Sequence, residues 1–192
     1  GDNLSAGDAI VIEGPAKYNT VTGFALKNTS GHGVGFNGNS GDDGPQYNVV
    51  SDGVIDGPGE AGVTMTNQGI AASVPTGNQA INIVVSNAGR VTTDQAFSVV
   101  GGTDNVFRDC TAIAGAQTDY GFRSLDGAGT EARNSLHGRL SGSFTVAEVA
   151  TEAEDTVVDV WQGTNTPAVL RAGDNSNYSP GRFTALRFSA PV

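Results

Sequence analysis

The sequence predicts an all-β chain that folds as a short right-handed parallel β-helix of about five coils. Three observations predict this fold class: a composition that disfavours helices, a recurring asparagine followed by apolar residues, and apolar residues at constant distances from that asparagine. The 192 residues include 28 glycines and only two lysines, and glycine loses the most backbone entropy when it enters a helix. A chain of this length fits one continuous domain better than two.

The recurring asparagine marks the start of each coil. It occurs at Asn19, Asn48, Asn82 and Asn105. The positions two, fifteen and seventeen residues later are β-forming or apolar in all four segments, and each set of equivalent positions is called a column below. The plus-two column holds Val21, Val50, Val84 and Phe107, the plus-fifteen column holds Val34, Val63, Phe97 and Tyr120, and the plus-seventeen column holds Phe36, Met65, Val99 and Phe122.

The spacing inside a coil predicts its shape. Three coils also have matching plus-five and plus-seven residues, whereas Asn87 and Gly89 break this pattern in the coil that starts at Asn82. The matching pairs are Phe24 and Leu26, Gly53 and Ile55, and Cys110 and Ala112. Steps of two residues are typical of a strand with one buried face, whereas the odd step from plus-two to plus-five requires a bend. Each coil is therefore predicted as strand, tight corner, strand, longer turn and strand.

The predicted coils differ in length. Successive starts are 29, 34 and 23 residues apart, and a fifth coil begins 29 residues further on at Asn134, with Leu136 and Val149 in its columns. The extra residues are predicted to enter after the plus-seventeen position, because a solenoid keeps its stacked strands and tolerates insertions at its corners. We therefore expect long corners along one edge. They span residues 37–46, 66–78 and 124–133.

The two ends of the chain differ from the coils. Residues 1–18 are predicted as an N-terminal cap, residues 19–154 as the β-helix, and residues 155–192 as a C-terminal cap or oligomerisation segment. The apolar run at residues 9–12 suits a cover for the first coil. The last segment holds short apolar runs between Gly, Asn and Pro turns, and unpaired end strands promote association.

The charge of the chain disfavours two classes of partner. Twenty Asp and Glu against ten Lys and Arg give a net charge of −10, which repels phosphate backbones and anionic lipid surfaces. Nucleic acid and membrane are therefore not expected as partners. The sequence also shows no apolar run of about 18 residues and no signal peptide, so neither a transmembrane segment nor a leader is expected.

Two kinds of residue receive a structural interpretation. Cys110 is the only cysteine, which excludes an internal disulfide, and its plus-five position predicts a small buried hydrophobe rather than a nucleophile. The asparagines that start the coils are predicted either as turn residues or as a side-chain ladder stacked coil on coil.

Two segments resemble a known family. Residues 105–112 and 120–123 are similar to coils of the pectate-lyase-like superfamily of right-handed parallel β-helices. The resemblance covers about residues 19–150 and implies the fold. The superfamily includes polysaccharide lyases, glycosidases, epimerases and the spikes and fibres of tailed viruses, so it does not choose among these functions. It also implies a homo-oligomer, with a trimer favoured.

The weak catalytic candidates are His32, Asp42 and Asp43. Polygalacturonase-like glycosidases of this fold use a Gly-His-Gly with paired aspartates, and glycoside hydrolysis requires two carboxylates beside one bond. In this chain the order is reversed, because the aspartates follow Gly31-His32-Gly33. A turn and a solvated loop tip explain these residues better, and no catalytic residue is assigned.

A lyase or epimerase would need a calcium ion or another cation beside a base. Arg108 and Arg123 are available cations, and Asp52 and Asp109 share the plus-four column. Ser86 is predicted in that column in the intervening coil, so the two carboxylates are expected about 10 Å apart, too far for one ion. No cofactor is therefore expected, and Ca²⁺ remains an alternative.

The lack of a coherent catalytic set favours a non-enzymatic role. We expect a virion structural protein or a receptor- or glycan-binding protein of a tailed virus, such as a tail spike, a fibre or a capsid decoration, at the virion or extracellular surface. Its expected partners are copies of itself, other virion proteins and a cell-surface glycan. The expected binding residues at the corner edge are Asp42, Asp43, Tyr47, Asn67, Asp126 and Arg133.

Two alternatives stay open. A polysaccharide lyase, glycosidase or epimerase acting on an acidic glycan would use the same fold, although the negative chain would repel a polyanion except at a local basic groove. A repeat-built interaction module of a bacterial surface assembly would need no viral connection.

Overall fold

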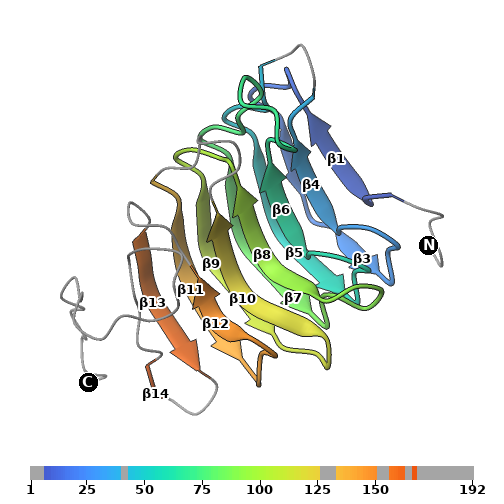
Figure 1. The fold of residues 1–192 in the computed structure, drawn as a ribbon, viewed down its shortest axis with the longest axis vertical. Helices are drawn as coiled ribbons and strands as arrows, with labels where there is room; N and C mark the ends of the chain where they lie inside the picture. The colour runs from blue at the N-terminus through green and yellow to red at the C-terminus, as the bar shows by residue number, and fades with distance from the viewer. Residues whose placement is uncertain (1–6, 40–42, 126–132, 151–155, 163–165, 168–192) are drawn as a thin grey trace.

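The computed structural model describes residues 7–39, 43–125, 133–150, 156–162 and 166–167. These residues form an all-β parallel solenoid of about four turns, with no helix among them (Figure 1). The predicted fold class is confirmed, with about four turns where the sequence predicts about five coils. Two sheets form the walls of the solenoid.

The smaller sheet has six strands in the order β1-β4-β6-β8-β10-β12, and all its neighbours run parallel. Its strands are β1 (Ile10–Glu13), β4 (Val34–Asn37), β6 (Val63–Thr66), β8 (Asp94–Val100), β10 (Thr118–Leu125) and β12 (Ala147–Ala150). Because β1 pairs with β4, part of the segment predicted as a cap extends this sheet.

The larger sheet has eight strands in the order β14-β13-β11-β9-β7-β5-β2, with β3 also paired to β5. Its strands are β2 (Thr20–Thr22), β3 (Ala25–Lys27), β5 (Val49–Asp56), β7 (Gln79–Ser86), β9 (Val106–Ile113), β11 (Ser135–Ser141), β13 (Thr156–Gln162) and β14 (Thr166–Pro167). Only the β13–β14 pair is antiparallel among the described strands. Across the described residues, no helix has the length and apolar character needed to cross a membrane.

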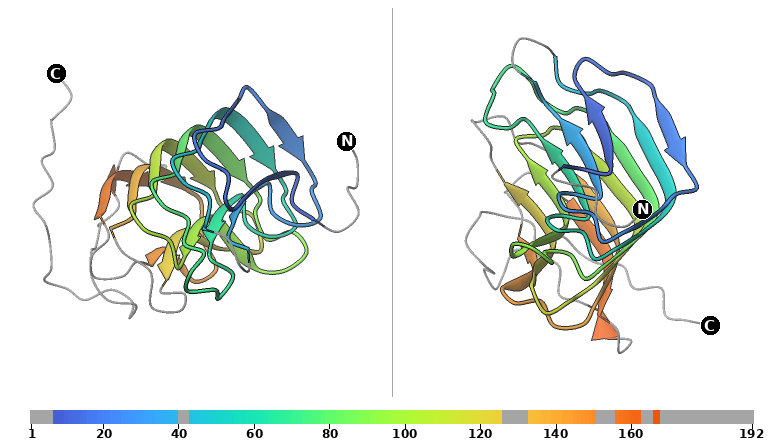
Figure 2. Two further views of the ribbon diagram at one scale, coloured as in Figure 1. Left: turned by 90° about the horizontal axis from the view of Figure 1, so that it is seen from above. Right: turned by 90° about the vertical axis from the view of Figure 1, so that its right-hand side faces the viewer.

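The strands of the larger sheet bend in the middle. Asp52 in β5, Asn82 in β7 and Asp109 in β9 have φ angles of 54°, 52° and 56°, and Gly23, with φ of 70°, separates β2 from β3. Positive φ reverses the local twist of the chain, and Asn, Asp and Gly adopt it more readily than other residues. The bend divides each coil into three sides, as the views in Figure 2 show. The predicted order of strand, tight corner, strand, longer turn and strand is confirmed.

Apolar side chains fill the space between the sheets. Val34, Val63 and Phe97 pair in register as predicted, and all three are fully buried. The ring centroid of Phe107, from the larger sheet, lies 5.4 Å from that of Phe97 and 5.5 Å from that of Phe122. Burying one such side chain contributes about 1.5–3 kcal/mol, so these columns supply much of the stability of the solenoid.

An asparagine ladder runs along the solenoid where the larger-sheet strands begin. Its members are Asn19, Asn48, Asn78, Asn105 and Asn134, at spacings of 29, 30, 27 and 29 residues. The side-chain oxygen of each later member accepts hydrogen bonds from the backbone N–H and the side-chain amide of the member one coil earlier, at 2.9–3.2 Å. All members except the first are fully buried. The ladder therefore satisfies polar groups that have no access to water.

The third member of the ladder is Asn78, so the prediction that the third coil starts at Asn82 is wrong. Asn82 lies at the bend of β7 and is exposed. With the start at Asn78, Ile83 and Val85 fill the plus-five and plus-seven columns, so the apparent break in the repeat disappears. The four ladder spacings are also more even than the predicted ones.

The same error misplaces one residue of the plus-two column. Ala80 pairs with Val50 and Phe107 and faces the core, whereas Val84 lies beyond the bend and is only half-buried. Both candidate starts have an asparagine followed by apolar residues. The hydrogen bonds to neighbouring coils distinguish them, and these are not visible in the local sequence.

The fourth coil is shifted by two residues from its predicted register. Phe122 pairs with Phe97, so the prediction that places Tyr120 in that column is wrong. The pairing of β10 with β8 is irregular between Thr118 and Tyr120, which accommodates a longer preceding turn. Tyr120 is half-buried, and the guanidinium carbon of Arg123 lies 5.1 Å from its ring centroid. Extra residues therefore enter this turn as well as the corners after plus-seventeen.

The long corners lie along one edge where the structure describes them, as predicted. Isolated parallel bridges join Lys17 to Gln46, Gln46 to Thr76, and Thr76 to Thr103. These bridges hold consecutive corners against one another just before the ladder. Residues 126–132 of the third predicted corner lie outside the described residues.

The coil predicted at Asn134 starts there. Leu136 pairs with Phe107 in the larger sheet, and Val149 pairs with Phe122 in the smaller one. Most of the segment 155–192 lies outside the described residues. The division into two caps and a central β-helix stays a prediction.

Cys110 is a core residue, as its column predicts. It is 1% exposed, and its thiol donates to the carbonyl oxygen of Ala80 over 3.3 Å. Burial raises the pKa of the thiol to about 12. Since the thiolate is the nucleophilic form, the folded chain holds Cys110 in an unreactive state.

We expect Asn78→Ala to lower the free energy of unfolding by about 3 kcal/mol, because it removes the acceptor for the buried backbone N–H and side-chain amide of Asn48 and the donor to the carbonyl oxygen of Pro45. Asn19→Ala, at the exposed end of the same ladder, is the matched control and should cost less than about 1 kcal/mol. Urea unfolding followed by circular dichroism measures both. Equal losses of unfolding free energy in the two variants would contradict the expectation that the buried members of the ladder contribute most to stability.

We expect Cys110 of the folded chain to react with a thiol reagent at pH 8 at least about 100-fold more slowly than in urea, because only a minute thiolate fraction exists at a pKa of about 12. Absorbance of the released chromophore measures the rate. Rapid labelling of the folded chain would show that the thiol is accessible.

Candidate functional site

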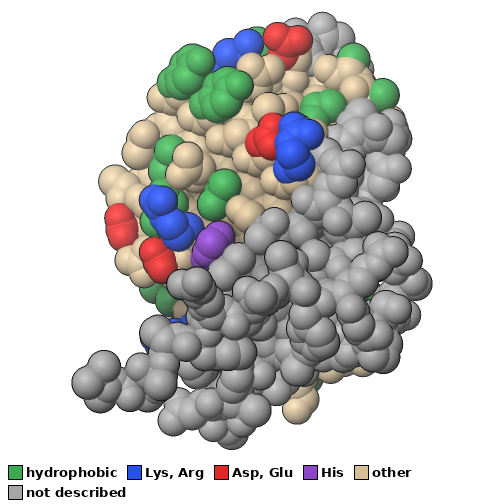
Figure 3. Space-filling view, turned by 90° about the vertical axis from the view of Figure 1, so that its left-hand side faces the viewer, with side chains coloured by type: hydrophobic (Ala, Val, Ile, Leu, Met, Phe, Trp, Pro, Cys, Tyr) green, Lys and Arg blue, Asp and Glu red, His purple; other side chains and the backbone are tan. Residues whose placement is uncertain are grey.

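The outer face of the larger sheet presents two columns of side chains on either side of the bend. One column contains Ser51, Ile81, Arg108 and His137, and the other contains Val54, Val84, Thr111 and Arg139. Because side chains alternate along a strand, these columns point away from the core. Figure 3 shows the side of the molecule on which β9, β11 and β13 lie in Figure 1, where basic, acidic and histidine side chains gather beside the grey residues.

An open groove of about 520 Å³ lies between the two columns. It is lined by Asn82, Arg108, Asp109, Cys110, Thr111, His137, Gly138 and Arg139. The pairing of β11 with β9 is irregular at Gly138, where a Cβ atom would lie 2.3 Å from the carbonyl oxygen of Cys110. Only glycine allows the two strands to approach this closely at the groove.

The groove is locally basic in an acidic chain. Arg108 and Arg139 are exposed, and neither forms an ion pair with any residue that the structure describes. His137 adds a side chain with two ring nitrogens, and Asp109 is the carboxylate in the lining. Two guanidinium groups without an ion-pair partner among the described residues can bind carboxylate or sulfate groups through paired hydrogen bonds.

The column of the bend contains Asp52, Asn82 and Asp109, so the prediction of Ser86 between the two aspartates is wrong. The wrong coil start explains the error. The side-chain amide of Asn82 donates to Asp52 over 2.8 Å, and this bond is the first of several that hold the pKa of Asp52 below its ordinary value. An amide side chain therefore stands between the two aspartates of this column.

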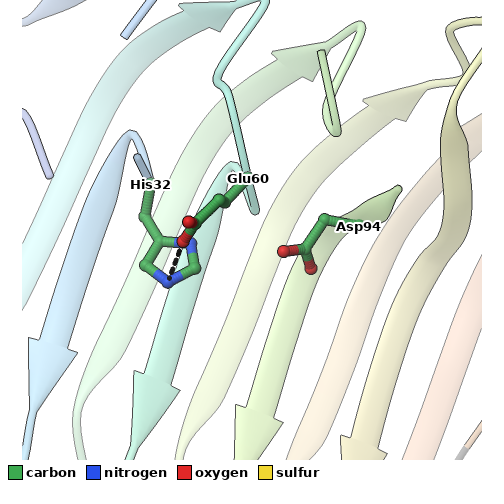
Figure 4. A group of neighbouring side chains, drawn as sticks. All are labelled: His32, Glu60 and Asp94. Atoms are coloured by element: carbon green, nitrogen blue, oxygen red, sulfur yellow. Dashed lines mark ion pairs between the residues drawn. The ribbon is translucent and has the colours of Figure 1, made fainter. Parts of the chain in front are cut away.

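A second cluster lies at the turn that leads from the larger to the smaller sheet. His32, Glu60 and Asp94 come from three successive coils, just before or at the start of β4, β6 and β8, and their side chains converge (Figure 4). His32 Nε2 lies 3.2 Å from Glu60 Oε2, and the backbone N–H of Ala61 donates to His32 Nδ1 over 3.0 Å. We call these three side chains the turn cluster. All three are half-buried.

The turn cluster brings an imidazole and two carboxylates together, and because His32 Nδ1 accepts the N–H of Ala61, the proton of the neutral ring lies on Nε2, toward Glu60. One nitrogen or oxygen atom of each side chain lies within 4.8 Å of those of the other two. Burial, more than any neighbouring charge, raises the pKa of Asp94, and the charge of Glu60 adds to the effect. His32 and Arg123 act in the opposite direction.

The structure separates the three weak catalytic candidates. His32 belongs to the turn cluster, whereas Asp43 lies 3.4 Å from Lys17 in an exposed ion pair at a long corner. Asp42 lies outside the described residues. His32 and Asp43 are therefore not joined in one glycosidase-like set.

Two of the predicted binding residues share a surface column just before the ladder. Tyr47 stacks on Tyr18, with centroids 5.5 Å apart and planes 11° apart, and both rings are exposed. Arg133 forms two hydrogen bonds with Asp104, at 2.7 and 2.8 Å. All four residues have positive φ, as does Gly77 between them, so this column projects from the solenoid at a sharp corner.

Of the remaining predicted binding residues, Asp43 is exposed at a long corner, whereas Asn67 is buried. Asn67 is fully buried, and its side-chain oxygen accepts from the N–H of Gly69 over 2.9 Å. It shapes a turn and is buried, which corrects the expectation of an exposed residue. Asp126 lies outside the described residues.

The sequence did not single out Glu60, Asp94 or Arg139. A signal for the first two was present, because His32, Glu60 and Asp94 stand two or three residues before Val34, Val63 and Phe97, whose column is predicted correctly. Arg139 carries no such signal, since its column depends on the irregular pairing at Gly138.

Comparisons with protein-family models, with curated proteins and with solved structures found no match to this chain. The parallel solenoid is established by the strand pairing, whereas membership of the pectate-lyase-like superfamily stays a prediction.

We expect Asp56→Asn to lower the free energy of unfolding at pH 7 by less than about 1 kcal/mol, the scale of partly exposed ion pairs. Hydrogen bonds from Asn87 and Ser86, then the charge of Lys27, lower the pKa of Asp56. A lowered pKa stabilises the fold above the ordinary value, 3.8, and this contribution disappears as the pH falls through the folded value. Urea unfolding between pH 7 and pH 3 measures the difference, and a difference that does not change with pH would contradict it.

Proposed function

We propose that this chain is a non-enzymatic glycan-binding module whose groove on the larger sheet binds an acidic saccharide. The observation that carries the proposal is the pair of exposed guanidinium groups, Arg108 and Arg139, that have no ion-pair partner in the described part of the chain. They flank an open groove whose remaining polar groups include a carboxylate, an imidazole and an amide.

The chemistry of the groove suits a saccharide that carries carboxylate or sulfate groups. A guanidinium binds such groups in a bidentate manner, while Asp109 accepts hydrogen bonds from hydroxyl groups and Asn82 both donates and accepts them. The groove is open, so an extended chain of sugars can lie in it without entering an enclosed cavity.

The charge distribution supports specificity for one place on the surface. The net charge of −10 repels a polyanion from most of the molecule, and the local cations offset this repulsion only at the groove. Binding should therefore weaken as salt concentration rises, because the ionic contacts lie at an exposed surface.

The display of this module on a virion or another surface assembly, and its trimerisation, belong to the same proposal. They are supported by the sequence resemblance and by the solenoid architecture that it implies. Association by the C-terminal segment would place several copies of the groove side by side, and linked sites bind a repeating polymer more tightly than one site does.

We expect the variant Arg108→Gln/Arg139→Gln to bind acidic oligosaccharides at least about 100-fold more weakly, because hydrogen bonds to charged groups contribute about 1.5–3 kcal/mol each. Titration calorimetry with oligogalacturonate, alginate and hyaluronan fragments, and with neutral dextran for comparison, measures this. The matched control is Lys17→Gln/Lys27→Gln, which removes the same charge from two exposed sites whose cations are already paired with Asp43 and Asp56.

The control variant should keep its affinity within a few-fold. An equal loss in both double variants would show that net charge, not the groove, governs binding. Failure of the native chain to bind any of the acidic glycans would overturn the proposal.

A specific observation also favours the enzymatic alternative, although less strongly. Arg108, Asp109 and His137 place a cation, a carboxylate and an imidazole in one groove, and a lyase needs a cation beside a base. The test is to look for unsaturated products from the same acidic glycans. If they form with the native chain and are lost in His137→Ala, the function of this groove is cleavage of the glycan and not binding alone.

A further inference from the structure

We infer that the stacked rings of Tyr18 and Tyr47 form a second saccharide-binding site, which takes a neutral pyranose ring against the open face of Tyr18. The two tyrosines stand at the corner before β2 and β5, in the first two coils, whereas the groove is built on β7, β9 and β11. The inference is independent of the proposed function, because it needs no charge on the sugar and no residue of the groove.

Most of the surface of the tyrosine stack is open to solvent. Tyr18 is 74% exposed and Tyr47 is 49% exposed. Their ring centroids lie 5.5 Å apart and their planes differ by 11°, so one face of Tyr18 lies against Tyr47. The exposed surface of Tyr18 therefore belongs to its other face and its edges, where a ligand ring can continue the stack.

The stack is held in place from below. Gly77 is the next member of the same corner column, and a Cβ atom there would lie 2.6 Å from Cδ1 of Tyr47. The Tyr47 ring therefore packs directly against the backbone of Gly77, and Tyr47 in turn supports one face of Tyr18. A ring that is positioned before the ligand arrives loses little conformational freedom on binding.

The backbone at both tyrosines is strained. Tyr18 and Tyr47 have φ angles of 60° and 55°. Positive φ is unfavourable for a bulky residue, whereas Gly77 and Asp104, which follow in the same column, belong to the residue types that adopt it readily. Tyrosine at these two positions thus costs stability through strain and through exposed apolar surface. Strain of this kind is concentrated at binding sites, and a ligand on the ring gives the tyrosines a role that a turn alone does not need.

The chemistry of the corner suits an uncharged sugar. A β-linked pyranose with equatorial hydroxyl groups has axial C–H groups on both faces, and the negative face of an aromatic ring attracts them. The phenolic hydroxyl groups of both tyrosines and the exposed side chain of Thr20 can bind the hydroxyl groups at the rim of the sugar. Lys17, which precedes Tyr18, is already paired with Asp43 over 3.4 Å, so this pair offers no net charge to an ionic ligand.

The test uses the full chain, labelled with fluorotyrosine at its four tyrosines and titrated with cellohexaose, a neutral β-linked glucan. We expect the fluorine NMR signals of Tyr18 and Tyr47 to shift with a Kd on the order of 1 mM, as suits one exposed stacking contact. The signal of Tyr120, which is half-buried beside Arg123, should not shift. Dextran, whose α-linkages place an axial oxygen on one face of each ring, should bind at least about 5-fold more weakly.

Tyr18→Asn removes the ring and keeps a residue that suits the backbone. Because Asn adopts positive φ more readily than Tyr, the Tm of this variant should stay within about 3 °C of the native value. We expect it to bind cellohexaose at least about 10-fold more weakly, whereas Tyr18→Phe keeps the ring and should stay within about 3-fold of the native affinity. Val91→Ala, which truncates another exposed apolar side chain, is the matched control and should bind like the native chain.

Three results would overturn the inference. The first is no shift of the Tyr18 signal with cellohexaose at roughly 10 mM, which would leave the tyrosine stack as a structural contact between two coils. The second is native affinity in Tyr18→Asn, or an equal loss in Val91→Ala, which would place the sugar elsewhere. The third is equal binding of dextran and cellohexaose, which would contradict stacking on a flat C–H face. Cellohexaose carries no acidic group, so none of these results bears on the groove.

Discussion

The asparagine ladder is the interaction on which the rest of the structure depends. Residues about 30 positions apart stack only if each coil begins at the same height and in the same phase, and the ladder imposes both. Each rung hydrogen-bonds a backbone N–H and a side-chain amide of the coil before it, in a place from which water is excluded. Once the ladder is set, alternation along the strands decides which side chains enter the core and which form the groove.

The sequence was sufficient for the fold class because the core columns repeat, but it was not sufficient for the start of every coil. Asn78 and Asn82 both precede apolar residues, and an offset of four residues preserves the inward and outward alternation of a straight strand. The strand is not straight, because Asn82 is itself the bend. Val84 therefore faces outward where the repeat predicts a core residue, and Ala80, an unremarkable alanine in the sequence, takes its place.

The functional residues were harder to predict than the core for a related reason. The turn cluster comes from three turns of the chain. Polar residues in turns are usually interpreted as solvent-exposed turn formers, so the sequence offered no reason to select His32, Glu60 and Asp94 as a group. Their convergence is a property of stacking, since each stands just before a member of the column Val34, Val63 and Phe97. Arg139 lines the groove together with Arg108 only because the pairing at Gly138 slips by one residue, and no pattern in the sequence predicts that slip.

Stacking also limits how far the two sites influence each other. In a solenoid each coil contacts only its neighbours. A local interaction therefore stabilises the adjacent coils, and its effect on stability decreases with distance along the axis. The turn cluster joins the turns that precede β4, β6 and β8, whereas the groove is built on β7, β9 and β11, two coils further along. The two share only the third coil, through Asp94 and Asn82, which lie at different corners of that coil. A rigid core of this kind transmits little unless it has two alternative packings, so a change at the turn cluster should affect the stability of the first coils without changing the shape of the groove.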